Sequence, residues 1–74
     1  MNKLIKINEF HSNGLIKTKG ITKNGKRFGK WFTWHLNGQK SKEINYYDGN
    51  PVGEWKMWRE NGKLHRTGAF DSNG

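Results

Sequence analysis

The sequence contains no cysteine, a single proline (Pro51) and few aliphatic side chains among its 74 residues. The missing thiols exclude disulfide bonds, thiolate metal centres and cysteine nucleophiles. Hydrophobic residues make up only 31% of the chain, which is low for a globular protein. A chain of this length also buries only about 60% of the surface that it exposes when unfolded. We therefore expect one small domain, residues 1–74, with a thin core.

Long hydrophobic runs are also missing. No stretch approaches the roughly 20 apolar residues of a membrane span. The opening segment, MNKLIKINEF, has no apolar run of signal-peptide length. A membrane partner is not favoured either, because there is no amphipathic anchor helix or lipidation motif. A cytoplasmic location is the expectation.

Acidic side chains are scarce, with six Asp and Glu against fourteen Lys and Arg and a net charge of +8. The imbalance is concentrated in residues 1–30, which hold eight bases and one acid, whereas residues 31–74 hold six bases and five acids. A surface of this sign favours anionic partners such as an acidic protein face or a nucleic acid.

The residues that usually carry catalysis show no arrangement for it. His11, His35 and His65 have no carboxylate at a metal-ligand spacing. No pair of acids is positioned for acid–base work, and no phosphate-binding glycine loop or serine-nucleophile motif is present. We predict a non-catalytic protein that uses no metal and no cofactor.

Aromatic residues and glycines are abundant instead, and they recur at a fixed interval. The segment WFTWHLNG (31–38) returns as WKMWRENG (55–62), 24 positions later, and INEFHSNG (7–14) lies 24 positions earlier. Three copies of one unit therefore cover the chain, at about 5–28, 29–52 and 53–74.

Each unit is predicted to be a β-hairpin. Asn-Gly between two β-forming runs favours a type I′ turn, in which both central residues need positive φ. Ten glycines spread along the chain argue against a helix of ordinary length. We expect an all-β fold, an antiparallel meander in one twisted sheet, with glycine-containing links between the hairpins. The predicted strands are about 4–12, 15–22, 30–36, 39–47, 54–60 and 63–70.

The pattern G-x-W-x-x-W-x-x-N-G in residues 29–38 and 53–62 resembles the MORN repeat (membrane occupation and recognition nexus), above all its bacterial antitoxin-like variant. Residues 5–14 depart from it, with Ile5 in the glycine position and Ile7 in the Trp position. The resemblance implies tandem β-hairpins that serve as a scaffold or a binding surface.

Strand alternation places Trp31 and Trp34 on opposite faces, because they are three residues apart. One face should carry a core ladder, and the other an aromatic column that either packs between repeats or binds a partner. The expected ladder is Ile7, Trp31 and Trp55, supported by Ile16, Ile44, Met57 and Leu64. The expected aromatic binding column is Phe10, Trp34 and Trp58.

The basic residues of the first half form the second candidate site. They either bind a partner's anionic groups or serve only to keep the sheet soluble and protect its edges. The candidates for partner or phosphate binding are Lys17, Lys19, Lys23, Lys26, Arg27 and Lys30.

These features favour a protein-binding inhibitor, antitoxin-like or anti-defence, directed at an acidic surface of a nuclease or a nucleoprotein complex. The alternative is a module that binds RNA or single-stranded DNA through lysines and stacking aromatics. The last strand, near 63–70, either pairs with a second copy through its edge or is protected there by Lys63, His65 and Arg66.

Overall fold

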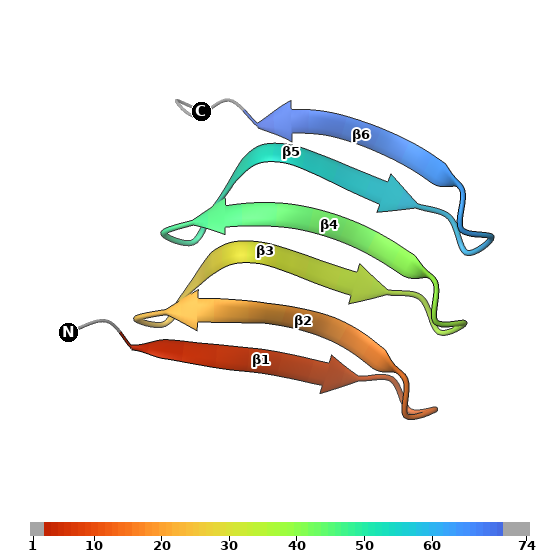
Figure 1. The fold of residues 1–74 in the computed structure, drawn as a ribbon, viewed down its shortest axis with the longest axis horizontal. Helices are drawn as coiled ribbons and strands as arrows, with labels where there is room; N and C mark the ends of the chain where they lie inside the picture. The colour runs from red at the N-terminus through yellow and green to blue at the C-terminus, as the bar shows by residue number, and fades with distance from the viewer. Residues whose placement is uncertain (1–2, 71–74) are drawn as a thin grey trace.

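The computed structural model describes residues 3–70; the first two residues and positions 71–74 of the third repeat lie outside this range. The described chain forms one six-stranded antiparallel sheet with the strands in sequence order, so the predicted all-β meander is confirmed (Figure 1). The strands are β1 (Leu4–Phe10), β2 (Ile16–Lys23), β3 (Lys26–Trp34), β4 (Lys40–Tyr47), β5 (Asn50–Trp58) and β6 (Leu64–Phe70).

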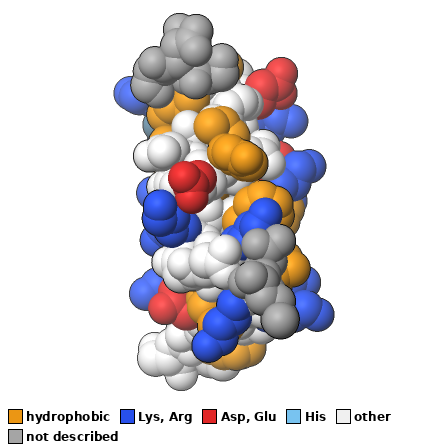
Figure 2. Space-filling model, turned by 90° about the vertical axis from the view of Figure 1, so that its left-hand side faces the viewer, with side chains coloured by type: hydrophobic (Ala, Val, Ile, Leu, Met, Phe, Trp, Pro, Cys, Tyr) orange, Lys and Arg blue, Asp and Glu red, His pale blue; other side chains and the backbone are white. Residues whose placement is uncertain are grey.

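The sheet has no second layer. Its Cα atoms span 39 × 28 × 10 Å, and the view from the β2–β3 and β4–β5 turns shows a narrow column with Lys and Arg side chains on both flanks (Figure 2). Trp31, 8% exposed, is the one buried hydrophobic side chain among residues 3–70. Over the same range no helix is long and apolar enough to cross a membrane.

The two kinds of connection between strands differ from the prediction. Positive φ at both central residues, as in a type I′ turn, occurs at Asn24-Gly25 (53° and 85°) and Asp48-Gly49 (52° and 86°). In the predicted turn at Asn13-Gly14 only the glycine has positive φ. There Gly14 N donates to His11 O (2.9 Å) and His11 N donates to Leu15 O (2.8 Å), which closes a three-residue loop. The type I′ assignment was therefore wrong for the Asn-Gly pairs inside the repeats.

Because the β2–β3 and β4–β5 turns are short, the strands after them are longer than predicted. β3 and β5 begin at Lys26 and Asn50, four residues before the predicted starts. Gly29 (φ 74°) and Gly53 (φ 68°) lie inside these strands at irregularities of the register, and not in links as predicted. A bulge with a left-handed glycine bends the strand and increases its twist, and both strands arch at this end of the sheet in Figure 1.

The register defines one face of the sheet, here called the tryptophan face. Ile7 lies opposite Gly20, Trp31 opposite Ile44, Ile44 opposite Trp55, and Trp55 opposite Gly68. Met57 is also on this face, because it pairs with Lys42 of β4, and Lys42 lies two residues before Ile44 on the same strand. The predicted ladder therefore exists for Ile7, Trp31, Trp55, Ile44 and Met57.

Two of the predicted supporting residues lie on the other side. Ile16 pairs with Phe10 and Leu64 pairs with Trp58, so both share the face of that aromatic column. The cause is a register shift of one residue beside each Asn-Gly loop, between Glu9 and Phe10 and at the equivalent points of the later hairpins. A shift of one residue exchanges the faces of the sheet.

A ladder of side chains joins the loop of one repeat to the next. His11 Nε2 lies 2.8 Å from Trp34 O, and Asn13 Nδ2 donates to Leu36 O at 2.8 Å. One repeat later, His35 and Asn37 make the same contacts to Trp58 O (2.8 Å) and Glu60 O (2.6 Å). Each of these asparagines also accepts, through Oδ1, the backbone N–H two residues ahead. These bonds hold the three loops together along one end of the sheet.

Candidate binding surface

The face opposite Trp31 and Trp55 gathers lysines around aromatic rings, and we call it the lysine face. Cross-strand pairing places Lys19 beside Asn8 and Phe32, and Lys40 beside Trp34. The two acids on this face are Glu43, which lies opposite Lys56, and Glu54. Its lysines are Lys6, Lys19, Lys23, Lys26, Lys30, Lys40 and Lys56, and its rings are Phe10, Phe28, Phe32, Trp34, Tyr47 and Trp58.

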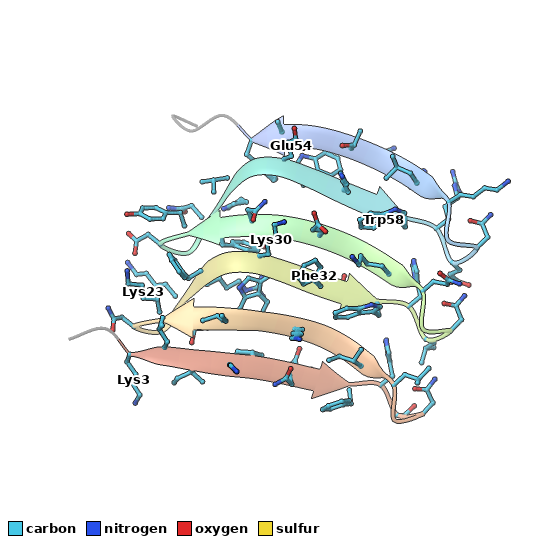
Figure 3. The ribbon with its side chains drawn as sticks, in the orientation of Figure 1. Lys3, Lys23, Lys30, Phe32, Glu54 and Trp58 are labelled. Atoms are coloured by element: carbon cyan, nitrogen blue, oxygen red, sulfur yellow. The ribbon has the colours of Figure 1, made fainter. Side chains whose placement is uncertain are left out.

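Three of these lysines, one from each of the first three strands, surround a shallow hollow. Lys6 of β1, Lys19 of β2 and Lys30 of β3 line it together with Asn8, Ile21 and Phe32, and its volume is about 450 Å³. Lys30 and Phe32 follow each other along β3 in Figure 3. The hollow therefore combines a cluster of positive charge with an apolar lining.

The hollow lysines have no acidic partner within the described part of the chain. The two ion pairs found there join Lys26 to Asp48 (3.4 Å) and Lys40 to Glu43 (3.8 Å). Three unpaired ammonium groups on adjacent strands repel one another and together attract an anionic group. The hollow therefore has a positive charge that attracts carboxylates or phosphates.

The rings beside the hollow carry cations over their faces. Lys40 Nζ lies 4.8 Å from the Phe32 ring centroid and 5.5 Å from that of Trp58, and Lys23 Nζ lies 5.0 Å from that of Phe28. These are cation–π distances. The lysine face therefore has ammonium groups over Phe28, Phe32 and Trp58, whereas Tyr47 on the same face is 66% exposed.

The structure brings together only some of the basic residues singled out in the sequence. Lys19 and Lys30 share the hollow, and Lys23 lies on the same face over Phe28. Lys26 is engaged with Asp48. Lys17 falls at the irregularity between β1 and β2, where the register passes from Thr18 to Ile16, and does not line the hollow.

Arg27 lies on the tryptophan face, away from the hollow. Its guanidinium carbon is 4.8 Å from the Trp31 ring and 5.3 Å from the Tyr46 ring. Its Nη1 also donates to Tyr46 Oη at 3.1 Å. These contacts give Arg27 a packing role over Trp31, the one buried hydrophobic side chain among residues 3–70.

The predicted aromatic column lies on one face but is not continuous. Trp34 and Trp58 are half-buried, whereas Phe10, on the edge strand, is 61% exposed. Trp34 packs against Phe32 at 5.9 Å between centroids, and Lys40 connects Phe32 with Trp58. Phe32 and Lys40 therefore belong to this surface, although neither was among the predicted binding residues.

Sequence reasoning also omitted Lys6, which completes the hollow. Its repeat equivalents are Lys30 and Glu54, and those of Lys19 are Glu43 and Thr67. The repeat positions of Lys6 and Lys19 are thus basic where the first two repeats meet, and acidic or neutral farther along the chain. This difference in charge between equivalent positions is the sequence signal that could have predicted the hollow.

No group of three or more His, Cys, Asp or Glu residues within positions 3–70 is arranged to hold a metal ion. Comparison of the chain with protein-family models, with curated proteins and with solved structures gives no match.

Proposed function

We propose that this chain is a non-catalytic protein-binding inhibitor that docks an acidic surface of its partner onto the lysine face. The role is antitoxin-like or anti-defence, with a nuclease or a nucleoprotein complex as the target. The observation that carries the proposal is the hollow, where Lys6, Lys19 and Lys30 have no carboxylate partner within the described residues.

An acidic protein surface matches both components of the hollow. Carboxylates of the partner would pair with the ammonium groups, and charge complementarity of this kind raises the association rate and excludes wrong partners. Apolar side chains of the partner would cover Phe32 and Ile21, which line the same hollow. Aromatic residues with a polar rim are typical of protein interfaces.

The lysines over the rings favour a protein partner above a nucleic acid. Base recognition on sheets relies on stacking against open aromatic faces. Lys40 lies over Phe32 and Trp58, and Lys23 lies over Phe28, so at these three rings a base would have to displace an ammonium group first. A carboxylate can instead bind the ammonium group where it lies.

Single-stranded RNA or DNA is the second candidate, and one observation supports it. Phe32 lines the same hollow as three unpaired lysines, which is the combination of phosphate-binding charge and aromatic surface that single strands use. Such binding would weaken steeply with rising salt, because each neutralised phosphate releases counterions.

Two further parts of the proposal concern family and location. The 24-residue recurrence of Trp31 and Trp34 as Trp55 and Trp58 supports a MORN-type repeat. A cytoplasmic location is proposed with it, since an inhibitor of a nuclease acts where that enzyme meets nucleic acid.

The test compares two variants that lose the same charge. Lys6→Gln, Lys19→Gln and Lys30→Gln together neutralise the hollow, whereas Lys3→Gln, Lys42→Gln and Lys63→Gln neutralise three lysines that do not line it. The natural chain and both variants are used to capture partners from lysate, with and without nuclease. A single-stranded oligoribonucleotide and polyglutamate are then titrated onto each purified protein.

We expect one protein to be captured after nuclease treatment by the natural chain and by the control variant, and to be lost with the hollow variant. Capture that disappears on nuclease treatment, together with oligoribonucleotide binding that requires the hollow, would establish the second candidate instead. Equal behaviour of the two variants would show that the hollow is not the binding site.

A further inference from the structure

Both outer strands of the sheet have an unpaired edge within the described range. β1 pairs only with β2, and β6 pairs only with β5. An edge strand exposes backbone N–H and C=O groups that can pair with another strand. The repeat indicates which strand matches each edge.

β1 occupies the same repeat position as β3 and β5, because Ile7, Trp31 and Trp55 are 24 residues apart. In the same way β6 is equivalent to β2 and β4, through Gly68 and Gly20. β2 is followed in the sheet by β3, and β4 by β5. The strand that belongs beside β6 is therefore a strand of the β1 type.

We propose that the β6 edge binds the β1 edge of a second copy of this chain, head to tail and antiparallel. The pairing of β4 with β5 sets the register, since Lys42 lies opposite Met57 and Ile44 opposite Trp55. The equivalent residues of β6 and β1 are Arg66 with Glu9, and Gly68 with Ile7.

Charge supports this register. Arg66 and Glu9 have opposite charges and would lie directly across from each other, and neither forms an ion pair within residues 3–70. The equivalent positions inside the sheet are Thr18 opposite Thr33 and Lys42 opposite Met57. Opposite charges in a directly opposed pair stabilise strand pairing, and like charges weaken it. The outer edges alone have complementary charges at this position.

Side-chain size supports the same register. The Trp55 indole lies over Gly68, where an added Cβ would be 2.6 Å from the ring. A second tryptophan on a strand paired beside Gly68 would clash with the Trp55 indole, which already covers this glycine. β1 carries the smaller Ile7 at the equivalent position. Ile7 already lies opposite Gly20, which Trp31 covers, so β6 presents the same combination of glycine and indole.

The loop ladder also continues in this arrangement. Asn13 and Asn37 donate through Nδ2 to a backbone carbonyl of the next repeat. Asn61 is the third member; its Oδ1 accepts from Lys63 N (2.9 Å), and its Nδ2 has no acceptor among the described residues. The carbonyl at the equivalent place is Ser12 O of the second copy.

A contact between two different edges does not close on itself. Each added copy leaves a new β6 edge, so the arrangement produces dimers, trimers and longer continuous sheets. This behaviour distinguishes it from a symmetric dimer, which would pair β6 with β6 and stop at two copies.

Cysteine pairing tests the register, because the natural chain has no thiol. In the Glu9→Cys, Arg66→Cys variant, the two thiols of one chain are five strand spacings, or about 24 Å, apart and cannot join. A disulfide between copies requires the proposed contact. The control is Glu9→Cys, Thr67→Cys, which places its thiols at the same edges but on opposite faces. We expect a non-reducing gel to show a ladder of oligomers for the first variant and at least tenfold less for the control.

Sedimentation of the natural chain provides a second measurement that needs no new side chain. We expect average mass to rise continuously with protein concentration, and Arg66→Glu to weaken association by about two- to fivefold through like charges. Exchanging the charges with Glu9→Arg and Arg66→Glu in one chain should restore the association. A natural chain that stays monomeric at millimolar concentration, equal cross-linking of the two cysteine variants, or a charge exchange without recovery would overturn the proposal.

Discussion

The indole of Trp31 lies directly over Gly20 on the neighbouring strand, so closely that any Cβ at Gly20 would overlap its ring. Trp55 covers Gly68 in the same way, but toward the opposite end of the sheet. Ile44 lies between the two tryptophans and opposite both. A single layer has no opposing sheet to cover its apolar face, and here flat rings lying over glycine backbone serve that purpose.

This relationship predicts a strong effect of a single methyl group. Gly20→Ala should lower the free energy of unfolding by about 1–3 kcal/mol, because the Trp31 ring must move from its site. Gly68→Ala should cost less, since Trp55 is only half-buried and β6 is an outer strand. Urea denaturation followed by tryptophan fluorescence measures both. Equal losses would show that the position of the ring over Gly20 is not limiting.

The asparagine ladder gives a comparison between equivalent residues. Asn37→Ala removes two hydrogen bonds, one that Oδ1 accepts from Gln39 N (2.9 Å) and one that Nδ2 donates to Glu60 O (2.6 Å), and should destabilise the fold by about 1–2 kcal/mol. Asn61→Ala removes only the bond from Lys63 N among the described contacts, and should cost about half as much. The measurement is urea denaturation at low protein concentration, where chains do not associate. A larger loss for Asn61 would contradict this account of the ladder.

Arg27 and Lys26 are neighbours in sequence with different predicted effects. Arg27→Ala should destabilise the protein by about 0.5–1 kcal/mol, because the guanidinium packs on Trp31 and Tyr46. Lys26→Ala should change stability by less than about 0.5 kcal/mol, since its ion pair with Asp48 is exposed. Neither change should alter the hollow. Thermal unfolding curves of the two variants decide the point, and an equal loss for both would refute the packing role.

Salt should stabilise the folded chain. Raising the ionic strength from about 0.01 M to about 0.1 M shortens the Debye length from about 30 Å to about 10 Å and screens repulsion among the lysines. We expect the free energy of unfolding to rise by about 0.5–1 kcal/mol. The variant with Lys6, Lys19 and Lys30 changed to Gln should show a smaller rise in the same urea titration. Stability that falls with salt would mean that ion pairs outweigh this repulsion.

The fold follows from the sequence to the extent that local signals decide it. The 24-residue recurrence and the Asn-Gly pairs predicted six strands in a meander, and the spacing of Trp31 and Trp34 predicted opposite faces. The turn geometry was not predictable in the same way. Asn13-Gly14 and Asn24-Gly25 are the same dipeptide, yet the Asn13 side chain bonds to the following repeat, and only Asn24 takes a positive φ.

The candidate site was only partly predictable because it depends on register across three strands. Lys19 and Lys30 were found from local charge, but Lys6 joins them only through the pairing of β1 with β2 and of β2 with β3. Arg27 was grouped with its basic neighbours, and strand alternation then placed it on the other face. Charge clusters along a sequence separate onto two faces once a strand forms, and a bulge such as that at Gly29 shifts their partners.

Within residues 3–70, the strands that make substantial contact with each other are always neighbours in the chain. The number of repeats can therefore change during evolution without loss of the fold. A gene duplication or deletion of one 24-residue unit would add or remove a hairpin and leave the remaining contacts in place. The sheet can lengthen or shorten in steps of one hairpin, while the charge of each unit changes independently.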